Sequence, residues 1–358
     1  MSPPLPLRPA LIAAAGYKSS YVPKTPDEIK LNHNESALDV DPATKSAILA
    51  KLLEEPWHRY DDPDGLRLRH ALARATGWPE AGIALGHGAN ELVQRLMWAL
   101  DSRSVVVTPS PDYYVYTRAA QVAGLTVRSL PLLHEGAHFS LDIEGLLQAP
   151  QGQPAALFLS WPNNPTGCLF DRGQILQLAQ RFAGLVIVDE AYFAYSHATL
   201  QPELPSQPNL VLLRTLAKAE ALAGVRLGYL LANVDLVSEL NKLSPPYPHG
   251  ILETVAAEVV LAQGERTQAR VAETLAQRQA MAEALRLMGI ESLESSGNFL
   301  LLHLGDEQPA ALEALAQAHI AVRDLGRVGQ WHGCLRLSVG TPVANARAVA
   351  ALASLFPA

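Results

Sequence analysis

The chain has 358 residues, 49% of them hydrophobic and 18% charged, which is the composition of a folded globular protein and excludes a disordered or fibrous one. Its formal net charge of -7 excludes the broad basic surface that nucleic-acid binding requires. The two cysteines, Cys168 and Cys334, are too few for a disulfide framework, and no run of 18 apolar residues predicts a membrane span. We therefore expect a cytoplasmic protein with neither nucleic acid nor membrane as a partner.

The first part of the chain predicts an N-terminal arm followed by helices. The arm covers residues 1–40, which begin with closely spaced prolines. Apolar residues then recur at helical spacing over 42–54, 66–76 and 89–100. Asp41 and Asp64 stand where a side chain can cap the first two of these helices, so we expect both to act as caps.

The middle of the chain predicts a mostly parallel β-sheet. Short runs rich in β-branched and aliphatic residues occupy 104–109, 125–130, 155–160, 185–190 and 210–215. Helical patterns such as 171–182 separate several of them. Continuous apolar runs of this kind are typical of strands that are buried on both faces. We therefore expect an α/β fold in which helices cover both sides of the sheet.

The prolines of SPPYPHG (244–250) interrupt any helix and indicate a boundary. A long helical stretch follows to about residue 288, and then come short strands and helices in alternation. The sequence thus predicts a large domain over 41–245 and a smaller α+β domain over 246–358.

Polar side chains collect where three predicted strands end. WPNNPTG, which contains Asn164, follows the strand at 155–160. Asp189 and Tyr192 close the next strand, and Thr215 closes the one after it, three residues before Lys218. Because ligands of open α/β sheets bind beyond the carboxyl ends of the strands, we expect these groups to face one crevice.

Lys218 is the feature that most directly indicates chemistry. The chain has seven lysines, five of them before residue 52, against twenty-one arginines, yet Lys218 lies within the largely small and apolar run TLAKAEALAGVRLGY. An amine must lose its proton to attack a carbonyl, which lysine can do and arginine cannot. A carboxylate such as Asp189 at the end of a buried strand needs a cationic partner, and a protonated pyridine nitrogen is one.

A candidate phosphate site lies earlier in the chain. GHGANE (86–91) places two glycines ahead of a helix, whose free N–H groups favour an anion. Arg226 and Thr215 can add a charge and a hydroxyl. Lysine, carboxylate and phosphate cradle together are the requirements of pyridoxal 5'-phosphate.

These motifs resemble the fold type I, pyridoxal-phosphate-dependent aminotransferases, and more closely the histidinol-phosphate aminotransferase family. The segments that carry the resemblance are LNHNES (31–36), RYDDPDG (59–65), GHGANE (86–91), TPSPDYYVYTRAA (108–120), PNNPTG (162–167), VIVDEAY (186–192), the lysine segment, IAVRD (320–324) and LRLSVGTP (335–342). The resemblance implies a mostly parallel sheet in a large domain, a smaller α+β domain, and ping-pong transfer of an amino group between a small-molecule amino donor and a 2-oxo acid in histidine biosynthesis.

The resemblance also implies a role for each site residue. Lys218 becomes the Schiff-base lysine and the proton carrier, Asp189 the partner of the pyridine nitrogen, and Asn164 and Tyr192 the contacts of the ring hydroxyl. The remaining cofactor contacts are Tyr113, which stacks on the ring, and Ala89, Asn90, Thr215 and Arg226, which hold the phosphate. Tyr60 reaches the cofactor of a neighbouring subunit, which implies a homodimer with shared active sites. Arg336, with Arg323, Tyr21 and Asn34, would bind the substrate carboxylate or phosphate.

Several alternatives stay open at this point. A threonine-phosphate decarboxylase or an aromatic amino-acid aminotransferase would use the same fold and cofactor, and a non-catalytic binding or regulatory protein could be built on it. A nicotinamide dehydrogenase is disfavoured because no GxGxxG follows the first strand. The sequence departs from the family at Ala217, Asn90 and Glu220, which weakens the substrate assignment. No pair of histidines has metal-ligand spacing, so His87 and the others are interpreted as structural and no metal is expected.

Overall fold

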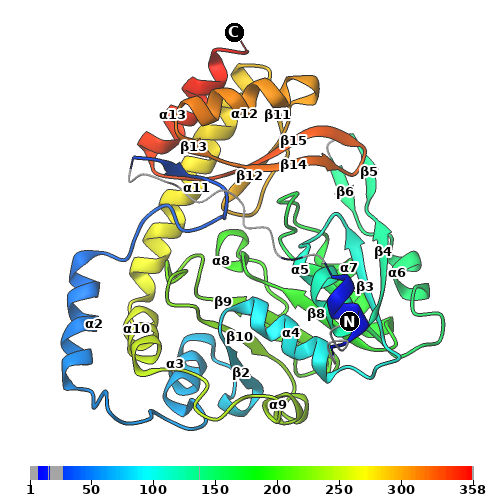
Figure 1. The fold of residues 1–358 in the computed structure, drawn as a ribbon, viewed down its shortest axis with the longest axis vertical. Coiled ribbons are helices and arrows are strands. Elements are labelled where there is room, and N and C mark those ends of the chain that lie inside the picture. The colour runs from blue at the N-terminus through cyan, green and yellow to red at the C-terminus, as the bar shows by residue number, and fades with distance from the viewer. Residues whose placement is uncertain (1–6, 15, 17–26, 137, 357–358) are drawn as a thin grey trace, which may run out of the picture.

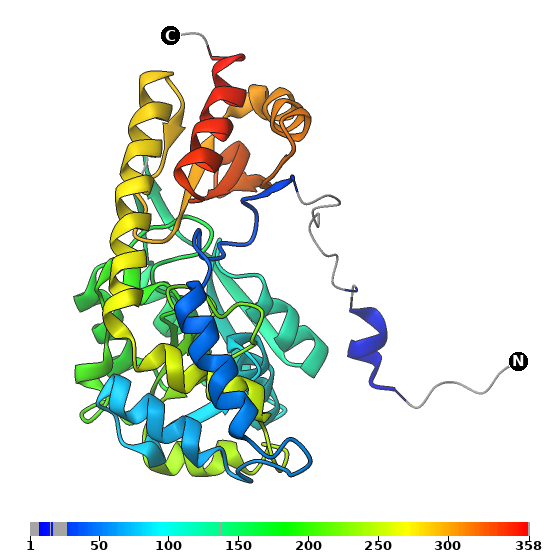
Figure 2. The ribbon, with the colours of Figure 1, turned by 90° about the vertical axis from the view of Figure 1, so that its left-hand side faces the viewer.

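The structure is a computed structural model that describes residues 7–14, 16, 27–136 and 138–356. It has a lower part built on a seven-stranded sheet and an upper part built on a four-stranded sheet (Figure 1). The long helix α11 (Gly264–Leu287) runs along the side of the molecule and contacts both parts (Figure 2). Tyr21, predicted to bind substrate, lies outside the described residues.

The seven-stranded sheet confirms the predicted α/β class. Its spatial order is β2 (Ile83–Gly86), β10 (Gly228–Leu231), β9 (Leu210–Thr215), β8 (Leu185–Asp189), β7 (Ala155–Ser160), β3 (Val105–Ser110) and β4 (Thr126–Pro131). Only β10 runs antiparallel to its neighbours; the other pairings are parallel. The sequence prediction missed β2 and β10, each of which is only four residues long.

Alternate residues of the strands face two separate hydrophobic cores, because successive side chains of a strand point to opposite faces. Val106, Phe158 and Ile187 pack under one group of helices: α4 (Ala89–Ala99), α5 (Val115–Ala123) and α9 (Val234–Asn241). Val107 and Leu157 pack under the other group: α3 (Leu66–Thr76), α6 (Ile143–Gln148), α7 (Arg172–Arg181) and α10 (Ile251–Leu261). Burial on both faces is why the strands read as continuous apolar runs.

The upper part is an antiparallel sheet backed by helices. Its strand order is β11 (Glu291–Ser292), β12 (Phe299–His303), β15 (Trp331–Ser338) and β14 (Arg323–Val328). Helices α12 (Gln308–Gln317) and α13 (Pro342–Ala353) share a core with these strands and with the end of α11. A short parallel pairing of β1 (Ile29–Lys30) with β13 (Ile320–Ala321) joins the beginning of the chain to this part. After β1 the chain reaches the edge of the seven-stranded sheet, where Asn34 bonds Tyr192 and Lys218 bonds the backbone oxygen of His33.

The elements not yet named are α1 (Pro9–Ala13), α2 (Pro42–Glu54), the β5 (Leu133–Glu135) and β6 (His138–Ser140) hairpin, and α8 (Phe193–Ser196). Helix α2 begins as predicted, because the backbone N–H of Thr44 donates to the Asp41 carboxylate at 3.0 Å. The prediction for Asp64 is wrong. Helix α3 begins after Gly65, and the carboxylate that accepts from its first turn is Asp62, which receives the Arg67 N–H at 2.8 Å.

The prolines at 245, 246 and 248 do separate two helices, α9 and α10. Helix α10, however, packs against α2 and α3 beside the seven-stranded sheet. The division of the chain at residue 245 stays a prediction, and these contacts favour a boundary nearer the start of α11.

Candidate active site

A cavity of about 290 Å³ opens where β7, β8 and β9 end. The predicted site residues that line it are Ala89, Asn90, Tyr113, Asn164, Asp189, Tyr192, Thr215, Lys218, Arg226, Arg323 and Arg336. Their positions span more than two hundred residues of sequence, and the sheet brings them together because parallel strands end at the same edge.

Two predicted residues lie elsewhere in the structure. Asn34 is buried behind the cavity and donates from its side chain to the Tyr192 hydroxyl at 3.0 Å. Tyr60 is 81% exposed and stacks on Tyr247 with ring centroids 4.5 Å apart. Tyr60 therefore does not reach the cavity of its own chain.

Lys218 lies in the loop after β9, and its amine donates hydrogen bonds to uncharged backbone oxygens. Its Nζ donates to the backbone oxygens of His33, at 3.0 Å, and Asn34, at 2.8 Å. Burial, with the positive charge of Arg336 nearby, lowers the pKa of Lys218 to about 7. The neutral amine, which is the nucleophilic form, is therefore well populated near neutral pH.

Asp189 closes β8 and is 5% exposed. The Tyr116 hydroxyl donates to its Oδ2 at 2.7 Å, and the Ala191 backbone N–H donates to its Oδ1 at 3.0 Å. Burial raises the pKa of Asp189 to about 6, and the Tyr116 hydrogen bond acts in the opposite direction. A cation placed against this carboxylate would restore its ordinary acidity.

The next residue, Glu190, points to the other side of the strand and belongs to the core. It forms an ion pair at 2.8 Å with Arg214, which also lies near the carboxyl end of a strand. Both side chains are almost fully buried. This ion pair satisfies two charges within the fold, so neither residue contributes to the cavity.

The start of α4 forms a cradle with Arg226. The helix begins after Gly88 without a side-chain cap, which leaves its first N–H groups directed at the cavity. Gly88 has a φ of 75°, and a Cβ there would lie 2.7 Å from a guanidinium nitrogen of Arg226. On the other side, a Cβ at Gly228 would lie 2.4 Å from the Ala89 nitrogen. The two glycines allow Arg226 and β10 to approach the end of the helix, and together these groups suit an anion such as a phosphate.

Arg336 closes the opposite wall from β15. It is 8% exposed and donates to the side-chain oxygen of Asn164 and, at 2.9 Å, to the backbone oxygen of Asn32. Its Nε has no hydrogen-bond partner among the described residues. Burial lowers the pKa of this guanidinium. A buried cation with a free donor fits an anionic ligand group, such as a carboxylate or a phosphate.

Asn164 connects the two walls. Its Nδ2 donates to the Tyr192 hydroxyl at 3.4 Å while its Oδ1 accepts from Arg336. Arg323, whose Cα pairs with that of Arg336 across β14 and β15, lies with its guanidinium 6.0 Å from the ring centre of Tyr114. Tyr113 donates to the Asn90 side chain at 3.2 Å and so lies over the start of α4.

Sequence reasoning missed two members of the site. Tyr116, for which the sequence predicts no role in the site, is fully buried and donates a hydrogen bond to Asp189. Asp112, which lines the cavity, accepts from the backbone N–H of Tyr113 at 2.6 Å and from the Ser160 hydroxyl. Burial raises the pKa of Asp112 to about 8. Asp112 follows the end of β3, so the strand-end argument applied to Asp189 would have found it.

Within the described residues no helix is long and apolar enough to cross a membrane.

The lysine, the buried carboxylate and the anion cradle at the carboxyl edge of a mostly parallel sheet define a group-transfer enzyme. Residues 26–352 match the family described as aminotransferase class I and II. The chain belongs to this family.

Relatives and solved structures agree with this assignment. The histidinol-phosphate aminotransferase of Chlorobium chlorochromatii is 33% identical, over 98% of this chain and 96% of its own. That of Xylella fastidiosa strain 9a5c is 37% identical, over 94% of this chain and 93% of its own. The structure is similar to that of the Sinorhizobium meliloti histidinol-phosphate aminotransferase in complex with pyridoxal-5'-phosphate, with a TM-score of 0.82, 25% identity, and coverage of 92% and 90% of the two chains.

Proposed function

We propose that the chain is a pyridoxal 5'-phosphate-dependent aminotransferase that transfers the amino group of histidinol phosphate to 2-oxoglutarate, in the cytoplasm. The observation that carries the proposal is one cavity that holds a lysine with lowered pKa, a buried carboxylate and a buried arginine with an unused donor. The names of the two relatives supply the choice of substrate.

The residues of the cavity fit the cofactor. The cradle of Gly88, Ala89 and Arg226 offers donors to a phosphate. A Cβ at position 88 would fill the space within this cradle. Asp189 offers a carboxylate to a ring nitrogen, and Asn164 and Tyr192 offer hydrogen bonds to a ring oxygen. When bound, pyridoxal phosphate supplies an aldehyde for amines and a ring that accepts electrons.

The chain's own groups then handle protons and charge. Lys218 can hold or release a proton near pH 7, so its Nζ is suited to move a proton to and from the reacting carbon. Asp189, supported by the Tyr116 hydroxyl, provides the negative charge that keeps a ring nitrogen protonated. Arg336 lines the cavity and orients the substrate by charge-assisted hydrogen bonds from its guanidinium.

The same arginine can serve both halves of the reaction. The carboxylate of glutamate and the phosphate of histidinol phosphate are both anions that a guanidinium binds well. One site can then bind the two substrates in turn, with Arg323 on the neighbouring strand as a second positive charge.

We also propose a homodimer with shared active sites. Tyr60 is exposed and does not line the cavity of its own chain, and Trp57, three residues earlier, is 65% exposed. Exposed aromatic side chains close together are typical of a protein interface. In the dimer, Tyr60 would complete the phosphate site of the neighbouring chain.

The test is a substrate panel with the purified full-length protein and added pyridoxal phosphate. We expect glutamate to form from L-histidinol phosphate and 2-oxoglutarate and only when both are present. Release of carbon dioxide from threonine phosphate would favour the decarboxylase instead, and glutamate formation only from aromatic amino acids would overturn the substrate assignment. Failure to bind pyridoxal phosphate would overturn the enzyme class.

A further inference from the structure

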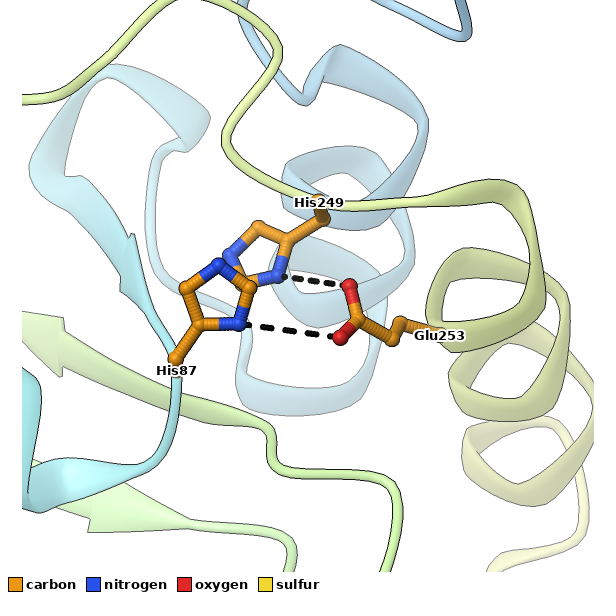
Figure 3. A group of neighbouring side chains, drawn as sticks. All are labelled: His87, His249 and Glu253. Atoms are coloured by element: carbon orange, nitrogen blue, oxygen red, sulfur yellow. Dashed lines mark ion pairs between the residues drawn. The ribbon is translucent and has the colours of Figure 1, made fainter.

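Two histidines and a glutamate meet outside the cavity, next to the phosphate cradle. His87 lies in the loop between β2 and α4, His249 in the loop before α10, and Glu253 in the first turn of α10, and all three side chains point toward one another (Figure 3). None of the three lines the cavity described above. The proposal below therefore does not depend on the proposed function.

The distances are those of ligands around one small ion. One ligand atom from each residue can be chosen so that all lie within 4.8 Å of one another. The Nδ1 atoms of His87 and His249 lie 3.6 and 3.5 Å from the two carboxylate oxygens of Glu253. A zinc ion bound at about 2.0–2.1 Å by tetrahedral ligands separates them by about 3.4 Å. Small side-chain rotations would close the site.

His249 has an unusual environment for a polar group. Its side chain is 1% exposed, and neither ring nitrogen has a hydrogen-bond partner among the described residues. A buried imidazole without such a partner is costly, and native proteins rarely leave one so. The ring is directed at Glu253 and lies 4.9 Å from the ring of His87 (Figure 3). This orientation favours a ligand that both imidazoles share.

Glu253 is positioned independently of any ion. Its Oε2 accepts the backbone N–H of Gly250 at 2.8 Å and so caps α10. Its Oε1, which faces His87, is the oxygen left for a further bond.

We propose that His87, His249 and Glu253 bind a divalent transition-metal ion of the zinc class. Ions of this class bind well to two imidazoles and one carboxylate, whereas Mg²⁺ and Ca²⁺ favour oxygen ligands alone. His87 is half exposed, so the ion has access from solvent and a position for water. The bound ion would tie the loop that precedes the cradle to the start of α10.

The test is a titration of the untagged, full-length holoenzyme with ZnCl₂, monitored by calorimetry. Metal analysis after dialysis then counts the ions that remain bound. We expect one ion per chain in the wild type. His249→Ala, His87→Ala and Glu253→Gln should each weaken zinc binding at least tenfold, since each removes or neutralises one ligand. Glu253→Gln retains an oxygen for the Gly250 cap, and His87→Ala changes an exposed side chain, so at least one variant should keep the native fold.

The matched control is His70→Ala, which removes a histidine from an exposed pair with Glu80 at 2.6 Å that belongs to no three-residue ligand group in the described part of the chain. It should bind zinc as the wild type does. Zinc should also raise the melting temperature of the wild type and of His70→Ala by a few degrees, but not that of His249→Ala. Less than one ion per wild-type chain, or equal binding by wild type, His87→Ala and Glu253→Gln, would overturn the proposal.

Discussion

The two walls of the cavity satisfy their charges in different ways. On the wall formed by the strand ends, Asp189 receives hydrogen bonds from Tyr116 and Ala191, so its position is set by the fold. On the facing wall, the partners that the buried guanidinium of Arg336 finds among the described residues are neutral oxygens, and no carboxylate balances its charge there. We propose that the first wall holds the cofactor in place and that the second binds the substrate anion. Substitutions on the two walls should therefore change different kinetic constants.

The largest expected effect is on the first wall. Lys218→Ala should lower kcat at least about 10⁴-fold, because both the amine that attacks an aldehyde and the carrier of the proton are lost. Glutamate formation and the absorbance of the protein-bound cofactor measure this directly. The control Lys242→Ala removes an exposed lysine paired with Glu239 and should leave both unchanged. Turnover by Lys218→Ala within tenfold of the wild type would refute the role of Lys218.

Substitutions on the second wall should change mainly KM. Arg336→Ala should lower kcat/KM about 10²–10³-fold, mainly through KM, because a buried charged contact to the substrate is removed. Arg336→Lys should restore only part of the loss, since an ammonium does not reproduce the guanidinium geometry. Steady-state kinetics over a range of both substrates separates the two constants.

The control for this wall is Arg327→Ala, an exposed arginine on the neighbouring strand β14, which should behave as the wild type. A fall in kcat at unchanged KM for Arg336→Ala would show that Arg336 acts on the chemical step, and the difference proposed between the walls would be wrong.

The two walls also differ in how far the sequence predicted them. Lys218, Asp189 and Asn164 follow strands whose apolar runs are plain in the sequence, so strand-end reasoning brought them to one cavity. Arg336 lies inside a strand of another sheet, and its place in the site followed only from the family resemblance. Its Nε lacks a hydrogen-bond partner among the described residues because of the way the two sheets pack together. The spacing of apolar residues along the sequence does not determine that packing.

The same limit explains why Tyr116 was missed. Tyr116 faces Asp189 because of the way α5 crosses the sheet, and a tyrosine in an amphipathic helix is more often a core residue. The proposed metal site combines a loop before α4 with the start of α10, and no spacing along the chain brings those two segments together. Pairings between distant elements become visible only in the folded structure.

A smaller effect tests how the first wall tunes its carboxylate. Tyr116→Phe removes the hydrogen bond that lowers the pKa of Asp189, so this pKa should rise and the acid limb of the pH profile of kcat/KM should move to higher pH. Activity at pH 6 should fall about three- to tenfold, the loss expected from one hydrogen bond. Tyr195→Phe removes a buried phenol that does not line the cavity and should leave the profile in place. An unshifted acid limb in Tyr116→Phe would mean that the Tyr116 hydrogen bond does not tune Asp189.

The smallest effect concerns the stability of the cofactor-free protein. Because the pKa of Lys218 is about 7 in the folded chain and 10.5 when unperturbed, the unfolded chain binds more protons between these values, and stability from this group rises with pH across that window. Lys218→Met, which cannot be protonated, should therefore gain most over the wild type at pH 7 and progressively less toward pH 10. Urea unfolding of both cofactor-free proteins at pH 7, 8.5 and 10 gives the difference in unfolding free energy at each pH. A difference that stays constant would show that the amine is not desolvated, and the first wall would then lack the neutral nucleophile that separates it from the second.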